Sequence, residues 1–196
     1  WDPVGLTAVS DEEVVHKETK SNLYYLRYYL SEGGKRGNKY VVIATTRPET
    51  IMADAAVCIN PSDERYHYLK GKKILIPLID KEIPIIEDDY VTMDFGTGCL
   101  KVTPAHDIND YEIGLRHKLP VIDMIDEHGR LNDKATILIG EERFEARKKI
   151  VKMLWDAGLM EKEEDYISPV GHSERTDAVI EPRLSLQWFL KMDELA

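Results

Sequence analysis

Two polar segments carry the side chains that are best suited to chemistry. The first, TTRPET at residues 45–50, follows a β-forming run and combines hydroxyls with a guanidinium that can point into a cleft. Pro48 fixes the turn within this segment. The alternative is a strand-end loop in which the threonines bond their own backbone. The candidate binding residues of this segment are Thr45, Thr46, Arg47 and Thr50.

The second segment, GTGCLKVTPAHDIND at residues 96–110, gathers charges at a strand-to-helix junction. Lys101 and Thr103 lie two residues apart in a predicted strand and therefore share a face. Asp107 and Asp110 lie three residues apart at a predicted helix start, where the helix dipole favours ionised carboxylates. The pattern predicts a polar pocket able to hold the ammonium and the hydroxyl of a small ligand.

Other chemistries fit the same residues poorly. The stretch from Gly96 to Thr103 lacks the glycine that directly precedes the lysine of a phosphate-binding loop, so phosphate binding is not expected. His106 beside Asp107 has no serine or cysteine nucleophile in an elbow sequence, so a structural hydrogen bond is the better interpretation of this histidine. Cys58 and Cys99 are isolated, and two carboxylates beside a lysine make a poor cation cage. We expect neither a metal nor a cofactor.

The elements that position these segments alternate short strands with few helices. A strand over residues 14–30 and another over 40–46 predict a hairpin with a long glycine-rich loop. A helical turn with a strand follows over 51–61. The other expected strands are 72–77, 83–86, 90–93, 99–103 and 121–125, and the expected helices are a short one capped by Ser62, one over 109–117 and one over 141–157.

This alternation predicts an α+β fold with a β-barrel-like core of short strands and a few flanking helices. Extended connector arms are expected at both ends. Residues 1–20 are interpreted as an N-terminal connector, 21–165 as the central domain and 166–196 as a returning arm. The chain lacks an initiator methionine, which suggests a piece of a longer protein.

Composition limits the partners. The formal net charge of −10 in 196 residues argues against a large nucleic-acid surface but permits contact with one strand end. Basic clusters at 35–36, 70–73 and 147–149 could serve such a contact, or could simply be solvated faces. There is no apolar run of membrane length and no signal-peptide pattern at the first residues, so a cytoplasmic location without membrane contact is expected.

TTRPET and GTGCLKVTPAHDINDYEIGLRH, with the flanking WDPVGL and LSLQWF, resemble the connective-peptide editing domain of the valyl-tRNA synthetases. The resemblance covers essentially the whole chain. Relatives that edit for leucine usually carry Asp in place of Glu49 and lack the Lys-Val-Thr run, whereas the isoleucine enzymes lack the Arg and Glu of TTRPET. Lys101 and Thr103 therefore favour valine. HSERTD stands where some members have zinc-binding cysteines, and the ATP-binding signatures are absent, so the resemblance implies neither zinc nor synthetic activity.

The resemblance implies hydrolysis of the ester that joins threonine to the 3′ end of tRNA-Val, with threonyl-adenylate as a further substrate. Asp110 would anchor the α-ammonium, while Lys101, Thr103 and Asp107 would satisfy the threonine hydroxyl. A bound water would attack, since no covalent nucleophile is apparent. The residues expected to position the adenosine and ester are Thr45, Thr46, Arg47 and Thr50, and Phe95 is expected to wall the pocket.

Three alternatives stay open at this point. The domain could serve a leucyl- or isoleucyl-type enzyme, could bind a tRNA 3′ end without catalysis, or could be a purely structural insert. In each case the resemblance implies that the chain is covalently part of a larger, monomeric synthetase.

Overall fold

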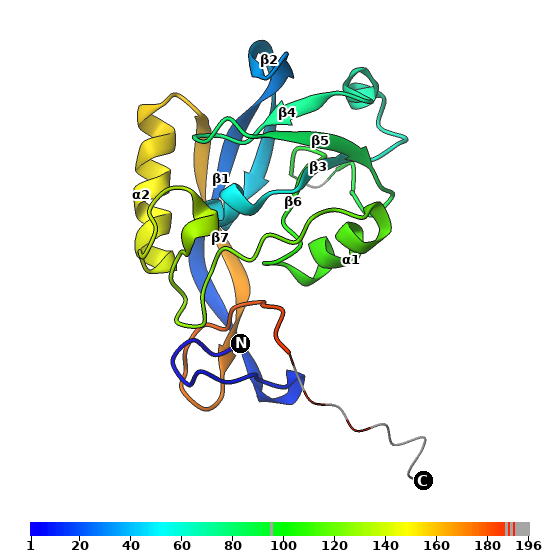
Figure 1. The fold of residues 1–196 in the computed structure, drawn as a ribbon. Coiled ribbons are helices and arrows are strands. Elements are labelled where there is room, and N and C mark those ends of the chain that lie inside the picture. Colours follow the sequence, from blue (N-terminus) through cyan, green and yellow to red (C-terminus); the bar gives the residue numbers. More distant parts are fainter. Residues whose placement is uncertain (95, 187, 189, 191–196) are drawn as a thin grey trace.

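The computed structural model describes residues 1–94, 96–186, 188 and 190, and one long strand organises them. That strand, β1 (Val14–Glu32), pairs antiparallel with β2 (Lys35–Thr45) and with β7 (Met160–Ser173). Alternate residues from Tyr24 to Leu30 are buried, as the period of two in a strand requires. One face of β1 therefore covers the core, and its first half projects as a ribbon with β7 (Figure 1).

The predicted long loop between β1 and β2 is wrong. The strands continue to Glu32 and Lys35, and only Gly33 and Gly34 form the turn. Their φ angles of 63° and 80° suit the tight hairpin turn that needs positive φ at both central residues. The remaining residues of the expected loop extend the ladder instead.

The sheet curves towards closure. Its strand order is β2-β1-β4-β5-β3-β6, with β7 added beside β1. The two ends of that order, β2 and β6, contact each other, so the predicted barrel-like α+β core is confirmed. The further strands are β3 (Ala56–Ile59), β4 (Lys73–Leu75), β5 (Glu82–Glu87) and β6 (Cys99–Val102).

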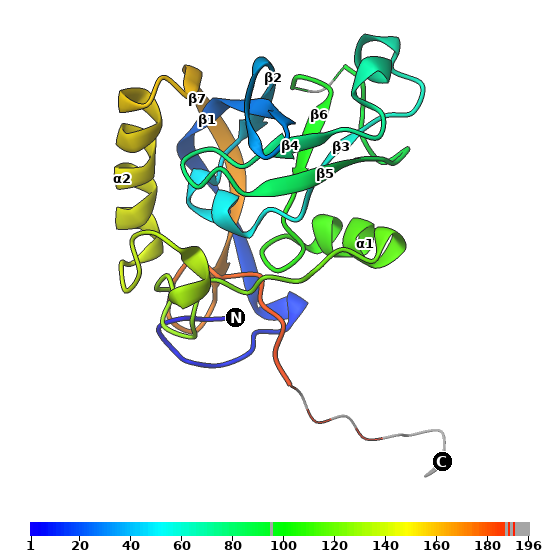
Figure 2. The same ribbon diagram turned by 45° about the horizontal axis from the view of Figure 1, so that its top comes forward.

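Two α-helices of the described chain flank this core on opposite sides (Figures 1 and 2). Helix α2 (Arg143–Asp156) buries Ala146, Ile150 and Leu154 in the main apolar cluster. Helix α1 (Ile108–His117) buries Ile113 in a smaller cluster behind β3 and β6. Short 3-10 helices are η1 (Asp11–Glu13), η2 (Pro48–Ala53), η3 (Glu64–Leu69) and η4 (Asp133–Ala135).

Three local expectations are wrong because side chains satisfy the backbone in place of a ladder or another cap. Residues 90–93 form turns, where the amide of Asn60 donates to the carbonyl of Val91 at 2.8 Å. Residues 121–125 form only a single bridge at Ile125, and the carbonyl of Asp123 accepts from a side chain. Asp63, not Ser62, caps η3, since its carboxylate accepts the Arg65 amide.

The first residue of the chain contacts the segment that follows β7. The backbone N–H of Glu181 donates to the carbonyl of Trp1 at 2.8 Å, and the N-terminal ammonium donates to the carbonyl of Glu181 at 3.0 Å. The predicted boundaries at residues 20–21 and 165–166 fall within β1 and β7, which pair without a break across them. The division into domain and connectors stays a prediction.

Candidate functional site

A cleft of about 740 Å³ lies between the β1–β7 ribbon, the TTRPET segment, the end of β6 and the start of α2. It brings both predicted segments together. Phe95 lies outside the described residues. The sequence-predicted residues that line the cleft are Thr45, Thr46, Arg47, Thr50, Lys101, Thr103, Asp107 and Asp110.

One wall of the cleft is a buried hydrogen-bond network around Lys101. Its ammonium donates to the hydroxyls of Thr103 and Thr50, at 2.5 and 3.2 Å, and to Oδ1 of Asp54, at 3.4 Å. The Thr103 hydroxyl in turn donates to Oδ1 of Asp54 at 2.7 Å. Tyr28 donates to Oδ2 of the same carboxylate, also at 2.7 Å. Lys101 and Thr103 share a face, as their spacing predicts.

Asp54 is not among the residues predicted from the sequence, although the sequence holds a signal for it. Asp54 is fully buried, and it stands as a lone charge in the apolar run IMADAAVCI. A carboxylate in such a run needs buried donors, because an unpaired buried charge is very costly. Burial raises the pKa of Asp54, while the Lys101 ammonium and the hydroxyls of Tyr28 and Thr103 oppose the rise.

Asp107 and Asp110 come from one helix start but hold different positions. Asp107 is the exposed N-cap of α1, and its carboxylate accepts the amides of Asn109 and Asp110 at 2.8 and 3.1 Å. Asp110 is buried, and its Oδ2 accepts the amide of Thr103 at 2.8 Å. Burial raises the pKa of Asp110 to about 7, against the opposing charge of Lys101. Burial is the largest influence on this carboxyl, although it stands in the first turn of α1.

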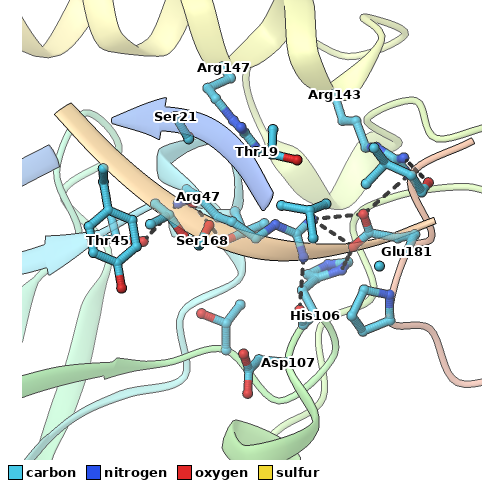
Figure 3. A pocket seen from close by; sticks show the side chains of 18 of the residues that line it. Thr19, Ser21, Thr45, Arg47, His106, Asp107, Arg143, Arg147, Ser168 and Glu181 are labelled. Atoms are coloured by element: carbon cyan, nitrogen blue, oxygen red, sulfur yellow. Dashed lines mark hydrogen bonds and ion pairs between the residues drawn. The ribbon is translucent and has the colours of Figure 1, made fainter. Parts of the chain in front are cut away.

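Arg47 anchors a second network in the cleft (Figure 3). Its guanidinium donates to both oxygens of Glu181, to the carbonyl of His106 at 2.9 Å and to Glu49 at 3.2 Å. The ring of His106 accepts the amide of Met124 at Nε2, so Nδ1 carries the hydrogen and faces Glu181 at 3.3 Å. The predicted structural role of His106 fits this geometry.

The acidic partners of Arg47, and the two arginines of α2 that pair with them, are also not among the residues predicted from the sequence. Glu49 is fully buried and accepts two hydrogen bonds from Arg147 of α2, at 2.7 and 2.8 Å. Arg143 lies 3.3 Å from Glu181 and donates to the carbonyl of Val179. Both arginines reach into the cleft from α2, while Asp107 lies on the opposite side (Figure 3). The signal was the pair of arginines four residues apart on a helix otherwise expected to bury apolar groups.

The hydroxyls of TTRPET divide between the two predicted roles. The Thr45 hydroxyl accepts the amide of Arg47 at 3.1 Å, and the Thr50 hydroxyl donates to the carbonyl of Arg47 at 3.0 Å. Both threonines thus satisfy local backbone, yet Thr50 also accepts from Lys101 in the cleft wall. The backbone and ligand-binding interpretations are compatible for Thr50.

The groups that line the cleft are hydroxyls, carboxylates and cationic side chains, which suit the binding of a polar ligand. Burial raises the pKa of Cys58 and of Cys99 to about 12, so neither thiol is a ready nucleophile at neutral pH. Among the described residues, no three His, Cys, Asp or Glu side chains gather as a metal site would require. No described helix has the length and hydrophobicity of a transmembrane span.

Comparison with known proteins identifies the family. Residues 59–153 match the model of the leucyl-tRNA synthetase editing domain. Over all 196 residues, the chain is 57% identical to the valine--tRNA ligase of Porphyromonas gingivalis, 58% to that of Bacteroides thetaiotaomicron and 53% to that of Geobacillus stearothermophilus. The chain spans 22% of the length of each of these relatives.

A solved structure has a similar fold. It is the ternary complex of Agrobacterium radiobacter K84 agnB2 LeuRS with tRNA and LeuAMS, with a TM-score of 0.52 and 17% identity over 85% of this chain and 22% of that chain. At this identity the likeness concerns the fold alone. The valine--tRNA ligases, in contrast, match over all 196 residues of this chain. The chain belongs to the editing-domain family of the aminoacyl-tRNA synthetases, in the form carried by valine--tRNA ligases.

Proposed function

We propose that this domain hydrolyses the ester of threonine with the 3′ end of tRNA-Val, and threonyl-adenylate as a second substrate. A hydrophobic synthetic pocket rejects threonine poorly, because threonine and valine are nearly isosteric, and valyl enzymes are the familiar example of this problem. A second, hydrolytic site solves it. The identity of 57–58% to valine--tRNA ligases over all 196 residues of this chain supports this assignment of substrate.

The observation that carries the proposal is the polar cleft wall formed by Lys101, Thr50 and Thr103 beside Asp110. A threonine hydroxyl can join this network. A valine side chain would displace water and leave the remaining acceptor lone pairs of the Thr50 and Thr103 hydroxyls without a donor, an unfavourable burial of acceptors. The wall therefore favours threonine over valine.

Asp110 is the proposed anchor of the substrate's α-ammonium. An incoming ammonium would favour the ionised form of Asp110 and lower its pKa from about 7. Arg47, Thr46 and Thr50 are proposed to position the adenosine and the ester, and Phe95 to wall the pocket. Asp107, exposed at the cleft, is proposed to face the threonine hydroxyl.

A bound water is the proposed nucleophile. The vicinal ribose hydroxyl of the substrate assists it, and the site contributes mainly orientation and electrostatic stabilisation. The reaction adds water across the ester and releases threonine and tRNA-Val with its 3′ hydroxyl restored. No metal or cofactor enters this scheme.

The domain is proposed to act within a longer cytoplasmic, monomeric synthetase that delivers the tRNA end. Its net charge of −10 predicts weak binding of tRNA by the isolated chain, strongest at low salt. A deacylation rate that does not change between low and physiological salt would contradict this point.

The test is a deacylation assay at low salt with threonyl-tRNA-Val and valyl-tRNA-Val side by side. We expect rapid loss of threonine and slow loss of valine, and a severe loss of threonine release in Lys101→Ala and in Asp110→Ala. Mischarged tRNA-Leu and tRNA-Ile test the leucyl and isoleucyl specificities, of which the former is favoured by the matched family model. Binding of the 3′ end without hydrolysis of any ester would make the domain a non-catalytic module.

A further inference from the structure

Asp54 has no place in the scheme above, yet it lies directly behind the cleft wall. It is fully buried at the end of η2, where its own amide donates to the carbonyl of Ile51 at 3.0 Å. The next amide, of Ala55, donates to the carbonyl of Val102 at 2.8 Å and continues the β3–β6 ladder. Small residues on both sides of Asp54 let the chain pass close to β6. The carboxylate is thus fixed by two elements before any side-chain contact is made.

The hydrogen bonds to the Asp54 carboxylate determine which groups of the cleft wall act as donors and which as acceptors. Three donors converge on Asp54, namely the hydroxyls of Tyr28 and Thr103 and the ammonium of Lys101. The Thr103 hydroxyl donates its one hydrogen to Asp54, so towards any other group its oxygen can act only as an acceptor. In the same way, the Thr50 hydroxyl donates its hydrogen to the carbonyl of Arg47.

The Lys101 ammonium is fully engaged as well. Its three hydrogens have three acceptors, the oxygens of Thr50, Asp54 and Thr103. No hydrogen of the ammonium remains for a ligand without breaking one of these bonds. Each threonine hydroxyl has one lone pair left, so these two cleft-lining residues can act towards a ligand only as acceptors.

We propose that Asp54 is a positioning residue that makes the cleft wall accept a hydrogen bond from the substrate's side-chain hydroxyl. This inference rests on the proposed function and adds to it the residue that fixes the polarity of recognition. A threonyl ester can donate such a hydrogen bond, whereas a valyl ester cannot. Asp54 does not line the cleft, so it acts through Lys101 and Thr103.

Stability alone is a poor reason for this arrangement. Buried ion pairs recover little more than the cost of removing both charges from water, and well-packed apolar residues often replace them without loss. A carboxylate that only held η2 against β6 would also not need its acceptors aimed at two cleft-lining side chains. The geometry favours a role in recognition.

The first test compares Asp54→Asn with the unaltered chain in the deacylation assay. The amide can donate as well as accept, so the Thr103 hydroxyl loses its fixed direction and Lys101 loses its counter-charge. We expect kcat/KM for threonyl-tRNA-Val to fall at least about 10-fold, and the slow valyl-tRNA-Val reaction to change by less than about 2-fold. A purely structural role would lower both rates together, and unchanged selectivity overturns the inference.

Two further variants keep the test decisive. Tyr28→Phe removes one bond to Asp54 but keeps its charge, so it should lower selectivity in the same direction and to a smaller extent if Asp54→Asn fails to fold. Asp2→Asn is the matched control, because Asp2 is an equally buried carboxylate outside the cleft. Its selectivity should not change.

A measurement without substrate separates this inference from the proposed function. In a proton–nitrogen NMR spectrum of lysine side chains, the Lys101 ammonium should give a signal that exchanges slowly with water, because three hydrogen bonds hold it. Lys101→Met should remove this signal. Asp54→Asn should shift and broaden that signal, and Asp2→Asn should leave it in place. An unshifted signal in Asp54→Asn overturns the inference, even in a chain that hydrolyses threonyl-tRNA-Val. If the unaltered chain hydrolyses no ester, the proposed function fails independently of this result.

Discussion

The guanidinium of Arg47 and the carboxylate of Glu181 join two segments that lie 134 residues apart in the sequence. Nη2 of Arg47 donates to both oxygens of Glu181, at 2.8 and 2.7 Å. Burial alone would raise the pKa of Glu181, but Arg47, His106 and Arg143 outweigh it and lower the pKa to about 2. The segment after β7 is therefore fastened to the TTRPET loop, and its position and that of the cleft depend on each other.

Glu181→Ala should lower the free energy of unfolding by about 3 kcal/mol. This value is near the lower end of the cost of breaking a buried ion pair, because Arg47 still pairs with Glu49. Freed from this contact, Arg47 should also lose its fixed direction at the cleft. The expected consequence is slower deacylation of threonyl-tRNA-Val at subsaturating tRNA. Urea denaturation and initial rates measure the two effects.

Glu164→Ala is the control for this change. The exposed carboxylate of Glu164 accepts hydrogen bonds from the half-buried Tyr25 and the exposed Lys162 of the β1–β7 ribbon. Exposed pairs contribute little, so the free energy of unfolding should change by less than about 0.5 kcal/mol. Equal losses in both variants would show that the Arg47–Glu181 contact has no special weight.

Asp107→Ala should destabilise the chain by about 1 kcal/mol, because α1 loses the carboxylate that caps two of its amides. Asp107→Asn should restore most of this stability, since asparagine is an equally good cap. Urea denaturation of both variants measures the capping term. If Asp107→Asn has native stability but impaired deacylation of threonyl-tRNA-Val, Asp107 also acts on the substrate. Native activity in that variant would limit Asp107 to capping.

Local patterns predicted the parts of the site that depend on neighbours in sequence. The shared face of Lys101 and Thr103 follows from the period of a strand, and the place of Asp107 follows from the preferences of helix starts. Both are consequences of backbone geometry over a few residues. The barrel-like fold could be predicted for the same reason, since its strands are short and separated by turn residues.

The partners across the cleft could not be predicted in this way. Asp54 meets Lys101 across 47 residues, and Glu181 meets Arg47 across 134. A strand period tells which side of a strand a residue occupies, but not which other element packs against that side. A single acidic residue in an apolar run, such as Asp54, predicts that hydrogen-bond donors surround it, but it does not predict which residues supply them. The strand predictions at 90–93 and 121–125 failed for a related reason, because side chains from other segments bond the backbone there.

Gly114→Ala should destabilise the chain although alanine is the better helix former. A Cβ at Gly114 would lie 2.9 Å from Cγ and 3.0 Å from Cβ of Pro104, so α1 must move away from the end of β6. The gain in helix propensity is about 1 kcal/mol, and the overpacking costs about 1–3 kcal/mol. The shift should also lengthen the bond between the Thr103 amide and Asp110 and slow deacylation. Glu112→Ala, exposed on the same helix, is the control and should change neither quantity appreciably.

The raised pKa of Asp110, about 7, predicts a pH-dependent stability. Between about pH 4 and pH 7 the folded chain keeps a proton on Asp110 that the unfolded chain releases. The folded state therefore binds more protons, and stability falls as pH rises through this window, by up to about 1.4 kcal/mol per pH unit. Asp110→Asn cannot titrate, so its stability relative to the unaltered chain should improve from pH 4 to pH 7 and then level off.

Urea denaturation of both chains at steps between pH 4.5 and 8.5 measures this difference, in which groups common to both chains cancel. The activity should run the other way, because only the ionised Asp110 can pair with the substrate's ammonium. Relative to spontaneous ester hydrolysis, deacylation by the unaltered chain should rise through about pH 7 and then level off. A stability difference that stays constant with pH would mean that Asp110 is ionised throughout, and the proposed anchor would then be present at every pH tested.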